Sequence, residues 1–350
     1  MLYKTVNPHG GDIYNDKIFL DFSSNTNPLG TPVSVTDAVK ESLKHLHCYP
    51  DPYCRKLVHD ISKSEGIEED YILCGNGAAE LIYSYCDAVK PKLAVELAPT
   101  FSEYSAALIR VGCKVERYML NQNTEFKIDE NFLDYIKDKK PDVIFLCNPN
   151  NPTGRLISHS LLEKILSVCK ELGIRLFIDE CFLDLTDNRT SMKIYISQNP
   201  SLFILKAFTK SYGMAGIRLG YCLCSDTGLL MEMSKNVHPW NVSVIAQAAG
   251  VAAVREQNFV KKSVNIICKE RKWLKEKLES LGIYVCPSEA NYILIYGPLG
   301  LDIKLKKHGI AIRNCDNFYG LTKGWYRMAI RLHKENEMLI AAVKSVCEKR

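Results

Sequence analysis

The segment DVIFLCNPNNPTGRLISHSLLEKILSVCKELGIRLFIDE, residues 142–180, has the pattern of a strand, a loop, a helix and a second strand. Its apolar runs at 142–147 and 174–179 are short and uninterrupted, as is usual for strands buried on both faces. Between them, residues 159–172 have the pattern of a helix. A helical connection of this length joins neighbouring parallel strands. The segment therefore predicts a parallel sheet covered by helices.

The same alternation continues on both sides of this segment. Near-continuous apolar strands that alternate with helices indicate an α/β fold with a mainly parallel sheet, sandwiched between helices. Further strands are predicted at 71–74, 93–98, 113–119, 202–208 and 219–224, and helices at 33–47, 54–63, 102–111 and 129–138 and from GNGAAE through Ala88.

The pattern changes after about Pro239. Two long helical stretches, 241–256 and 257–281, precede short strands and a closing amphipathic helix at 334–348; the strands are predicted at 283–286, 291–296 and 325–331. We therefore predict a smaller α+β domain over 240–350, behind a large domain over 33–239. Residues 1–32, rich in Asn, Pro and Gly, are expected to be an irregular arm that joins the small domain and the substrate site.

The composition is that of an ordinary globular protein. The 350 residues are 47% hydrophobic and 24% charged, enough for two substantial domains without a disulfide or metal staple. The net charge of +5 comes without a dense basic run, which argues against a nucleic-acid partner. No apolar run reaches the roughly 18 residues that would predict a membrane span.

The 14 cysteines are scattered along the chain, and the start MLYKTVNPHGG lacks the apolar stretch of a signal peptide. This usage favours reduced thiols and a cytoplasmic location. The densest group of metal-ligand types is His45, His47 and Cys48, with Cys54 beyond it, and its spacing fits no zinc module. We therefore expect no metal.

The stretch FTKSYGMAGIRLGY, residues 208–221, carries a lysine, Lys210, in a glycine-containing loop with Arg218 eight residues later. A lysine forms imines with carbonyl compounds only as the neutral amine, so its pKa must be lowered by burial or by a nearby positive charge. Arg218 could supply that charge while binding a phosphate. Taken alone, the stretch is better explained as a surface loop with ordinary solvated charges.

Three more loops at predicted strand ends carry unusual chemistry, and open α/β sheets bind ligands at the carboxyl ends of their strands. The turn at 75–79, GNGAA, would free backbone N–H groups at a helix N-terminus for an anion, or is a plain tight turn. In NPNNPTG the prolines leave Asn151 as the amide aimed inward. Asp179 closes an apolar strand, where a carboxylate needs a partner or caps a turn.

Together these parts are those that hold pyridoxal 5'-phosphate: a lysine imine, an aspartate for the ring nitrogen, an asparagine for the ring hydroxyl, and a glycine turn with arginine for the phosphate. The motifs NPNNPTG, DE-x-F and FTKSYGMAGIRLGY, in this order, resemble the fold-type I pyridoxal-phosphate enzymes of the aspartate aminotransferase superfamily. Within it, HGGDIY, DFSSNTNPLG, RNCDNFYGL and YRMAIR are most similar to the threonine-phosphate decarboxylases of cobalamin biosynthesis, which are themselves similar to histidinol-phosphate aminotransferases.

The resemblance implies roles for these residues. Lys210 would hold the cofactor covalently, Asp179 would pair with its pyridine nitrogen, and Asn151 would contact the ring hydroxyl. Many aminotransferases have Tyr where this chain has Phe182, which removes one hydrogen bond to that hydroxyl. The other implied cofactor contacts are Asn76, Gly77, Ala78, Thr209 and Arg218 around the phosphate, Phe101 stacked on the ring with Tyr104 as a second candidate, and Tyr49, which would reach the phosphate from the other subunit of a homodimer.

Substrate contacts are implied by both ends of the chain. Arg327 matches an arginine that binds the substrate carboxylate, and Arg331, four residues on, would share its face of a strand. A second guanidinium suits a phosphorylated amino acid, although Arg331 alone would be read as a surface salt bridge. The remaining candidates are His9, Gly10 and Gly11, which would close over the substrate phosphate unless His9 is a solvated arm residue, and the pocket amides Asn27, Asn151 and Asn291.

The resemblance implies a decarboxylase of L-threonine O-3-phosphate, which differs from serine phosphate by one methyl group. The alternative is an aminotransferase of the histidinol-phosphate type, since a sequence does not fix the torsion that selects the bond to be broken. A catalytically silent cofactor-binding protein is disfavoured because Lys210 and Asp179 are both present.

Overall fold

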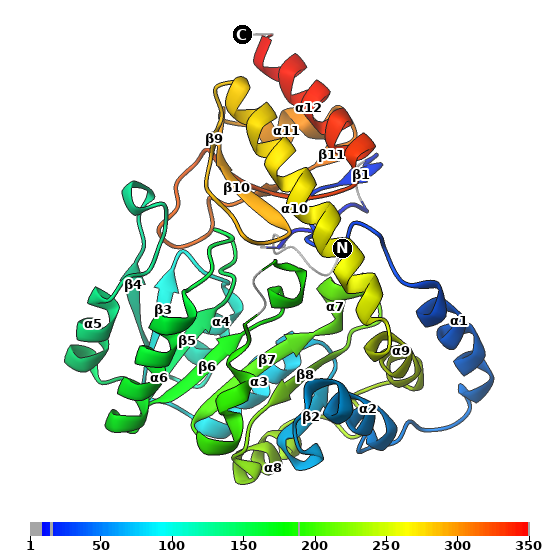
Figure 1. Cartoon of the computed structure of the whole chain (residues 1–350), viewed down its shortest axis with the longest axis vertical. Coiled ribbons are helices and arrows are strands. Elements are labelled where there is room, and N and C mark those ends of the chain that lie inside the picture. The colour runs from blue at the N-terminus through cyan, green and yellow to red at the C-terminus, as the bar shows by residue number, and fades with distance from the viewer. Residues whose placement is uncertain (1–8, 15–16, 188–189, 349–350) are drawn as a thin grey trace.

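A seven-stranded sheet forms the centre of the larger part of the molecule (Figure 1). The computed structural model describes residues 9–14, 17–187 and 190–348. Every strand of this sheet runs parallel to the others except β8, which is antiparallel to both of its neighbours. In sheet order the strands are β2 (Ile72–Gly75), β8 (Gly220–Leu223), β7 (Leu202–Ala207), β6 (Arg175–Asp179), β5 (Val143–Cys147), β3 (Leu93–Ala98) and β4 (Lys114–Met119).

Side chains of the central strands alternate between two core layers. On β5, Ile144 and Leu146 pack into one layer, and Phe145 and Cys147 pack into the other. Strands β6 and β7 divide their side chains in the same way. Because both faces are buried, every position of these strands can be apolar, which explains the uninterrupted runs in the sequence.

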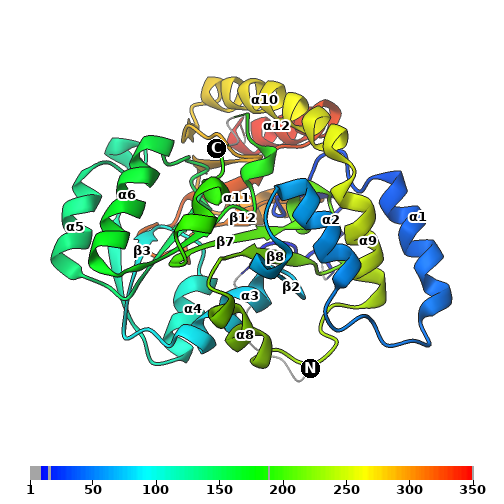
Figure 2. The ribbon, with the colours of Figure 1, turned by 60° about the horizontal axis from the view of Figure 1, so that its bottom comes forward.

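Helices cover both faces of the sheet. Figure 2 shows α3 (Ala78–Val89), α4 (Glu103–Arg110) and α8 (Thr227–Lys235) together below it. The opposite layer includes side chains from α2 (Arg55–Glu65), α5 (Asn131–Lys139) and α6 (His159–Leu172). Beside α2, helix α1 (Val33–Ser42) packs on α9 (Val244–Val254).

The smaller part lies at the top of Figure 1 and contains a four-stranded antiparallel sheet. Its order is β12 (Arg313–Asn314), β13 (Trp325–Ala329), β10 (Tyr292–Tyr296) and β9 (Tyr284–Val285), and α10 (Gln257–Ser280), α11 (Leu301–Lys306) and α12 (His333–Glu348) accompany it. The N-terminal arm joins this part, because β1 (Leu20–Asp21) pairs in parallel with β11 (Ile310–Ala311).

The predicted fold class is confirmed, and most predicted elements lie within two residues of the observed ones. Two boundaries differ by more: the helix 33–47 ends at Ser42, before a 3-10 turn, and the helix 241–256 begins at Val244. Two strands end slightly earlier than predicted: 202–208 ends at Ala207 because Phe208 begins α7 (Phe208–Ser211), and 325–331 ends at Ala329. Strands β1, β11 and β12 were not predicted, because two residues show no periodicity. The domain boundaries at 32 and 239 stay predictions.

Among the described residues, no helix is both long and apolar enough to cross a bilayer. Eleven of the 14 cysteines are buried, Cys48 is exposed, and none of the cysteines is paired in a disulfide.

Candidate active site

Four of the predicted site loops meet at one edge of the large sheet. Strands β3, β5, β6 and β7 are parallel, so their carboxyl ends lie on the same side. Phe101 follows β3, Asn151 follows β5, Asp179 ends β6, and Lys210 follows β7. This is the edge at which open α/β sheets bind ligands.

Lys210 has the pKa that an imine-forming lysine needs. Burial, followed by the positive charge of Arg327, lowers the pKa of its amine from 10.5 to about 8, and Arg218 contributes less. Arg218 therefore supplies positive charge, as the sequence suggested, but Arg327 supplies more. The Lys210 ammonium lies 5.4 Å from the centroid of the Phe182 ring. Thr209 precedes Lys210 in α7 and is half-buried.

Asp179 is held by two donors. Its Oδ1 accepts from the backbone N–H of Cys181 at 2.9 Å, and its Oδ2 accepts from the Tyr104 hydroxyl at 2.6 Å. Burial raises the pKa of the carboxyl group, while hydrogen bonds from Cys181 and Tyr104 oppose that shift. A cationic ring nitrogen is the kind of partner that would favour the ionised form further.

Tyr104 does not have the place expected of a ring-stacking residue. Its side chain has no exposed surface and packs against Phe145 and Phe177, and its hydroxyl donates to Asp179. Phe101 is half-buried, and its ring packs edge-on against Tyr104 at 5.6 Å. Of the two aromatic candidates, only Phe101 retains exposed surface for a stacked ring.

The NPNNPTG loop is fixed by two of its asparagines, which frees the third. Asn148 accepts from the Ile157 N–H at 2.8 Å, and Asn150 donates to the carbonyl of Pro99 at 2.9 Å. The Oδ1 of Asn151 instead accepts from Arg327. With that oxygen occupied, the amide nitrogen of Asn151 is the group left to donate to a ring hydroxyl.

The glycine turn and Arg218 form a close cradle. A Cβ on Gly77, at φ +82, would lie 2.6 Å from Nη2 of Arg218, so the guanidinium fits against the turn only because residue 77 is glycine. Ala78 begins α3, where the helix leaves its first N–H groups without internal partners. Asn76 differs from the expectation, because its N–H donates to Glu80 at 2.7 Å and its side chain is exposed.

Two arginines face each other across the small sheet. Arg313 on β12 is directly opposite Arg327 on β13, so both side chains emerge on one face. Burial lowers the pKa of both guanidinium groups, and Arg327 lowers that of Arg313 further. Like charges directly opposite each other repel, and an anion bound beside both guanidinium groups would relieve that repulsion.

Arg331 is placed differently from its expectation. It lies beyond the end of β13, and its guanidinium binds Glu335 at 2.8 and 3.0 Å. The predicted shared strand face with Arg327 was wrong, because the pattern showed no strand end between them. Arg313 was missed, although it lies in the motif RNCDNFYGL, which is similar to the decarboxylases. What marks Arg313 as a site residue is its pairing with Arg327 across two strands, and that pairing is visible only in the fold.

The HGG arm packs beside Arg327. Gly11 donates to Ser23 Oγ at 2.8 Å, and a Cβ on Gly10 would lie 2.4 Å from the carbonyl oxygen of Ser23. Arg327 donates to the same carbonyl at 2.8 Å. His9 forms an ion pair with Glu103 at 2.9 Å, at the start of α4. The arm is therefore at the site.

Two asparagines of the arm, Asn25 and Asn27, differ in their contacts. Asn27 donates to the Ser211 carbonyl at 2.8 Å and to Ser263 at 2.7 Å, so its amide holds the protein rather than lining a pocket. Asn25, which the sequence did not single out, is 1% exposed, and neither of its side-chain polar atoms has a partner among the described residues. Asn291 donates to the Asn25 carbonyl, while its own Oδ1 is unpartnered in the same sense.

Tyr49 lies on the surface, 78% exposed, and stacks on Trp240 with ring centroids 4.5 Å apart. Its side chain is therefore available to another molecule, as a contact from one subunit to the other requires. No cluster of three His, Cys, Asp or Glu side chains suited to a metal occurs within the described part of the chain.

Comparison with known proteins decides the family. The model of the family "Aminotransferase class I and II" matches residues 17–344. The chain belongs to this family. It is similar to the threonine-phosphate decarboxylase of Salmonella typhimurium, with 34% identity over 97% of this chain and 96% of that one. The resemblance proposed from the motifs is confirmed.

Solved structures of class I and II enzymes have the same fold. The histidinol-phosphate aminotransferase of Clostridium acetobutylicum matches with a TM-score of 0.87 and 32% identity, over 95% of this chain and all of that one. The L-threonine-O-3-phosphate decarboxylase of Porphyromonas gingivalis matches with a TM-score of 0.82, over 94% and 99% of the two chains, at 22% identity.

Enzymes of this family use pyridoxal phosphate, and the residues present fit that group. The Gly77 and Arg218 cradle offers a guanidinium and helix N–H groups to a phosphate. Asp179 and Lys210 lie at the ends of neighbouring strands. These donors match the charges of the phosphate, the ring nitrogen and the aldehyde.

Proposed function

We propose that this enzyme decarboxylates L-threonine O-3-phosphate to (R)-1-aminopropan-2-ol O-2-phosphate and CO2, with pyridoxal 5'-phosphate as cofactor. The observation that carries the proposal is the full-length similarity to a threonine-phosphate decarboxylase. The cross-strand pair of half-buried Arg313 and buried Arg327 supports it, because a phosphorylated amino acid brings two anionic groups. When bound, the cofactor accepts the electrons of the bond that breaks at the substrate Cα.

In this proposal, each group of the chain has one task. Lys210, with a pKa near 8, supplies a neutral amine for attachment of the cofactor. Asp179 binds the ring nitrogen, and Tyr104 orients the carboxylate. Arg218, Thr209, Gly77 and Ala78 bind the cofactor phosphate.

The substrate is bound from the small sheet and the arm. Arg327, oriented by Asn151 and the Ser23 carbonyl, binds the substrate carboxylate. Arg313 takes the phosphate role first expected of Arg331. The HGG arm covers the phosphate.

An aminotransferase of the histidinol-phosphate type is the second candidate. It is supported by 32% identity to such an enzyme of known structure. The two reactions differ in whether the carboxylate or the hydrogen at Cα is held perpendicular to the cofactor ring, which is a matter of one torsion. Lys210 would then take the proton from Cα.

One experiment separates these candidates. The purified protein with pyridoxal phosphate is incubated with threonine phosphate, and CO2 and the phosphorylated amine are measured. Parallel reactions contain serine phosphate, or histidinol phosphate with 2-oxoglutarate. We expect equal amounts of CO2 and amine from threonine phosphate. Keto-acid formation without CO2 would refute the decarboxylase and leave the aminotransferase.

We also propose a homodimer in which Tyr49 of each subunit completes the phosphate site of the other. The exposure of Tyr49 and the neighbouring exposed Leu46, Tyr53 and Trp240 supports this. Mixing an inactive Tyr49→Ala protein with an inactive Lys210→Ala protein tests it. Hybrid dimers contain one site with both native residues, so activity should return, and its absence in a confirmed hybrid would contradict the shared site.

A further inference from the structure

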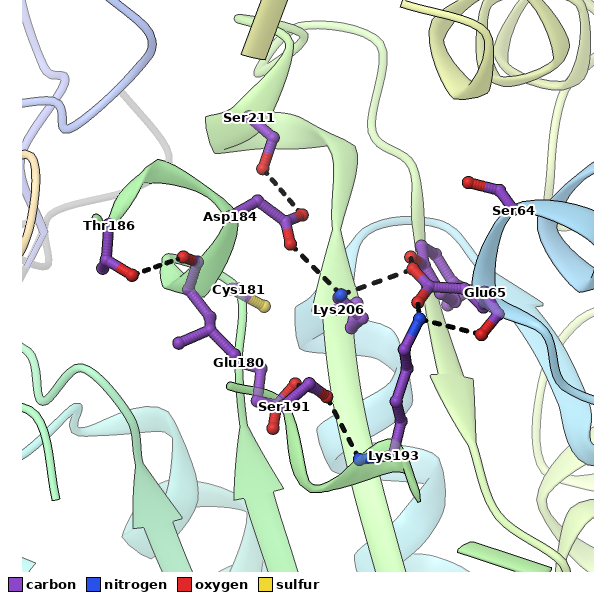
Figure 3. A network of polar contacts seen from close by, with 12 residues as sticks. Ser64, Glu65, Glu180, Cys181, Asp184, Thr186, Ser191, Lys193, Lys206 and Ser211 are labelled. Carbon is purple, nitrogen blue, oxygen red and sulfur yellow. Dashed lines mark hydrogen bonds and ion pairs between the residues drawn. The ribbon is translucent and has the colours of Figure 1, made fainter. Parts of the chain in front are cut away.

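A network of buried and partly buried charges contacts Ser211, the residue after Lys210 (Figure 3). Lys206 on β7 has 6% of its side chain exposed, and its Nζ lies 3.2 Å from Asp184 Oδ1 and 3.3 Å from Glu65 Oε1. Lys193 binds the other oxygen of Glu65 at 2.6 Å. These four side chains border a cavity of about 200 Å³, whose lining includes none of the residues assigned to cofactor or substrate.

The central pair of the network, Glu65 and Lys206, is ionised at neutral pH. Burial alone would raise the pKa of Glu65, but Lys206 and Lys193 lower it to about 2. Burial would lower the pKa of Lys206, yet the carboxylates of Asp184, Glu65 and Glu180 raise it. Removing one member of such a buried set leaves an unpaired charge, so the groups hold one another in place.

Two connections join this network to the active-site loops. Ser211, the residue after Lys210, donates to Asp184 Oδ2 at 3.2 Å. Asp184 itself belongs to the 3-10 turn Leu183–Leu185, five residues after Asp179. Because α7 contains only four residues, it is too short to keep its position by its own hydrogen bonds.

We propose that Asp184, fixed by Lys206, which Glu65 also binds, is a positioning residue that keeps Lys210 in register with Asp179. This inference rests on the proposed function, in which the two side chains hold one cofactor. Asn27 holds the same loop from the arm side. Its backbone N–H donates to the Lys210 carbonyl at 3.1 Å, and its side-chain amide donates to the Ser211 carbonyl at 2.8 Å. Asp184 therefore provides the anchor from the sheet side.

The variant Ser211→Ala tests the connection while leaving every ion pair in place. The amine pKa of Lys210 is measured in the full chain freed of cofactor, by competitive acetylation and mass spectrometry over a range of pH. We expect this pKa to rise from about 8, because a less fixed lysine is less buried. The rate of covalent capture of pyridoxal phosphate, trapped with borohydride, should fall about tenfold, since loss of position slows reaction.

Ser191→Ala is the matched control. Ser191 lines the same cavity, and its hydroxyl donates to the buried carboxylate of Glu180 at 2.5 Å rather than to Asp184. We expect it to change thermal stability and leave the Lys210 pKa and the capture rate as in the wild type. Asp184→Asn is a second variant: it keeps an acceptor for Ser211 but removes a charge from Lys206, and should act in the same direction as Ser211→Ala.

The outcomes are separable. If Ser211→Ala and Asp184→Asn lower only the melting temperature, with the Lys210 pKa and capture rate equal to those of Ser191→Ala, the positioning role is refuted. If the wild type has the expected lysine pKa but captures no pyridoxal phosphate, the proposed function fails instead. The acetylation measurement still decides whether Asp184 positions Lys210.

Discussion

The lowered pKa of Lys210 makes the stability of the cofactor-free protein depend on pH. An ordinary lysine has a pKa of 10.5, and that of Lys210 is about 8 in the folded chain. Between these values the unfolded chain binds one more proton than the folded chain, so the free energy of unfolding rises with pH. The difference corresponds to about 3 kcal/mol, gained between pH 8 and 10.5.

Lys210→Met removes this contribution, because methionine fills a similar volume without titrating. Urea unfolding of both cofactor-free proteins at pH 7, 8, 9 and 10 gives the free energy of the wild type minus that of the variant. We expect the wild type to gain relative to the variant as the pH rises. Lys170→Met, which removes an exposed lysine from α6, controls for the loss of one charge. A flat difference for Lys210→Met over this range would refute the assigned pKa.

Three further outcomes are expected. Gly77→Ala should weaken binding of pyridoxal phosphate in a spectrophotometric titration. Gly112→Ala should not, because Gly112 also has a positive φ but has open space where a Cβ would lie. Equal effects of the two variants would show that backbone strain alone is responsible. Arg313→Gln should raise KM for threonine phosphate about tenfold or more, and Arg331→Gln much less; the reverse order would restore the role to Arg331. Glu65→Gln should lower the free energy of unfolding by about 3 kcal/mol at pH 7 and make the acid unfolding transition, followed by circular dichroism, less steep. Ionised Glu65 stabilises the folded chain above pH 4.5, and this stabilisation is lost as the pH falls to about 2. An unchanged acid transition would contradict the network.

Local patterns predicted what local physics determines. The buried strands of the large sheet were visible because both faces demand apolar side chains, and the site loops were visible because each follows such a strand. The sequence alone therefore predicted that Lys210, Asp179 and Asn151 lie at one edge of the large sheet. The pattern of 325–331 was misleading for the opposite reason: nothing in the sequence marks Ala329 as the last paired residue.

Pairings distant in sequence were not predictable. Arg313 on β12 lies opposite Arg327 on β13. The side-chain amide of Asn27 donates to Ser211, whereas that of Asn25 has no partner among the described residues, and this difference arises only when the arm has folded. The link from Ser211 to Asp184 also depends on how two loops approach in space. Such contacts follow from tertiary structure, which a single sequence does not reveal.

The pairing of β1 with β11 determines when the site can be completed during synthesis. Leu20 pairs with Ile310, so the two strands are 290 residues apart. At the usual rate of translation, the arm waits roughly 15 to 60 s for its partner to be made. During that interval the small sheet, against which Asn25 and the HGG motif pack, has not yet been made. Lys210 and Asp179 are made earlier, so the edge that we propose binds the cofactor can form while the proposed substrate-binding half of the site still awaits the last tenth of the chain.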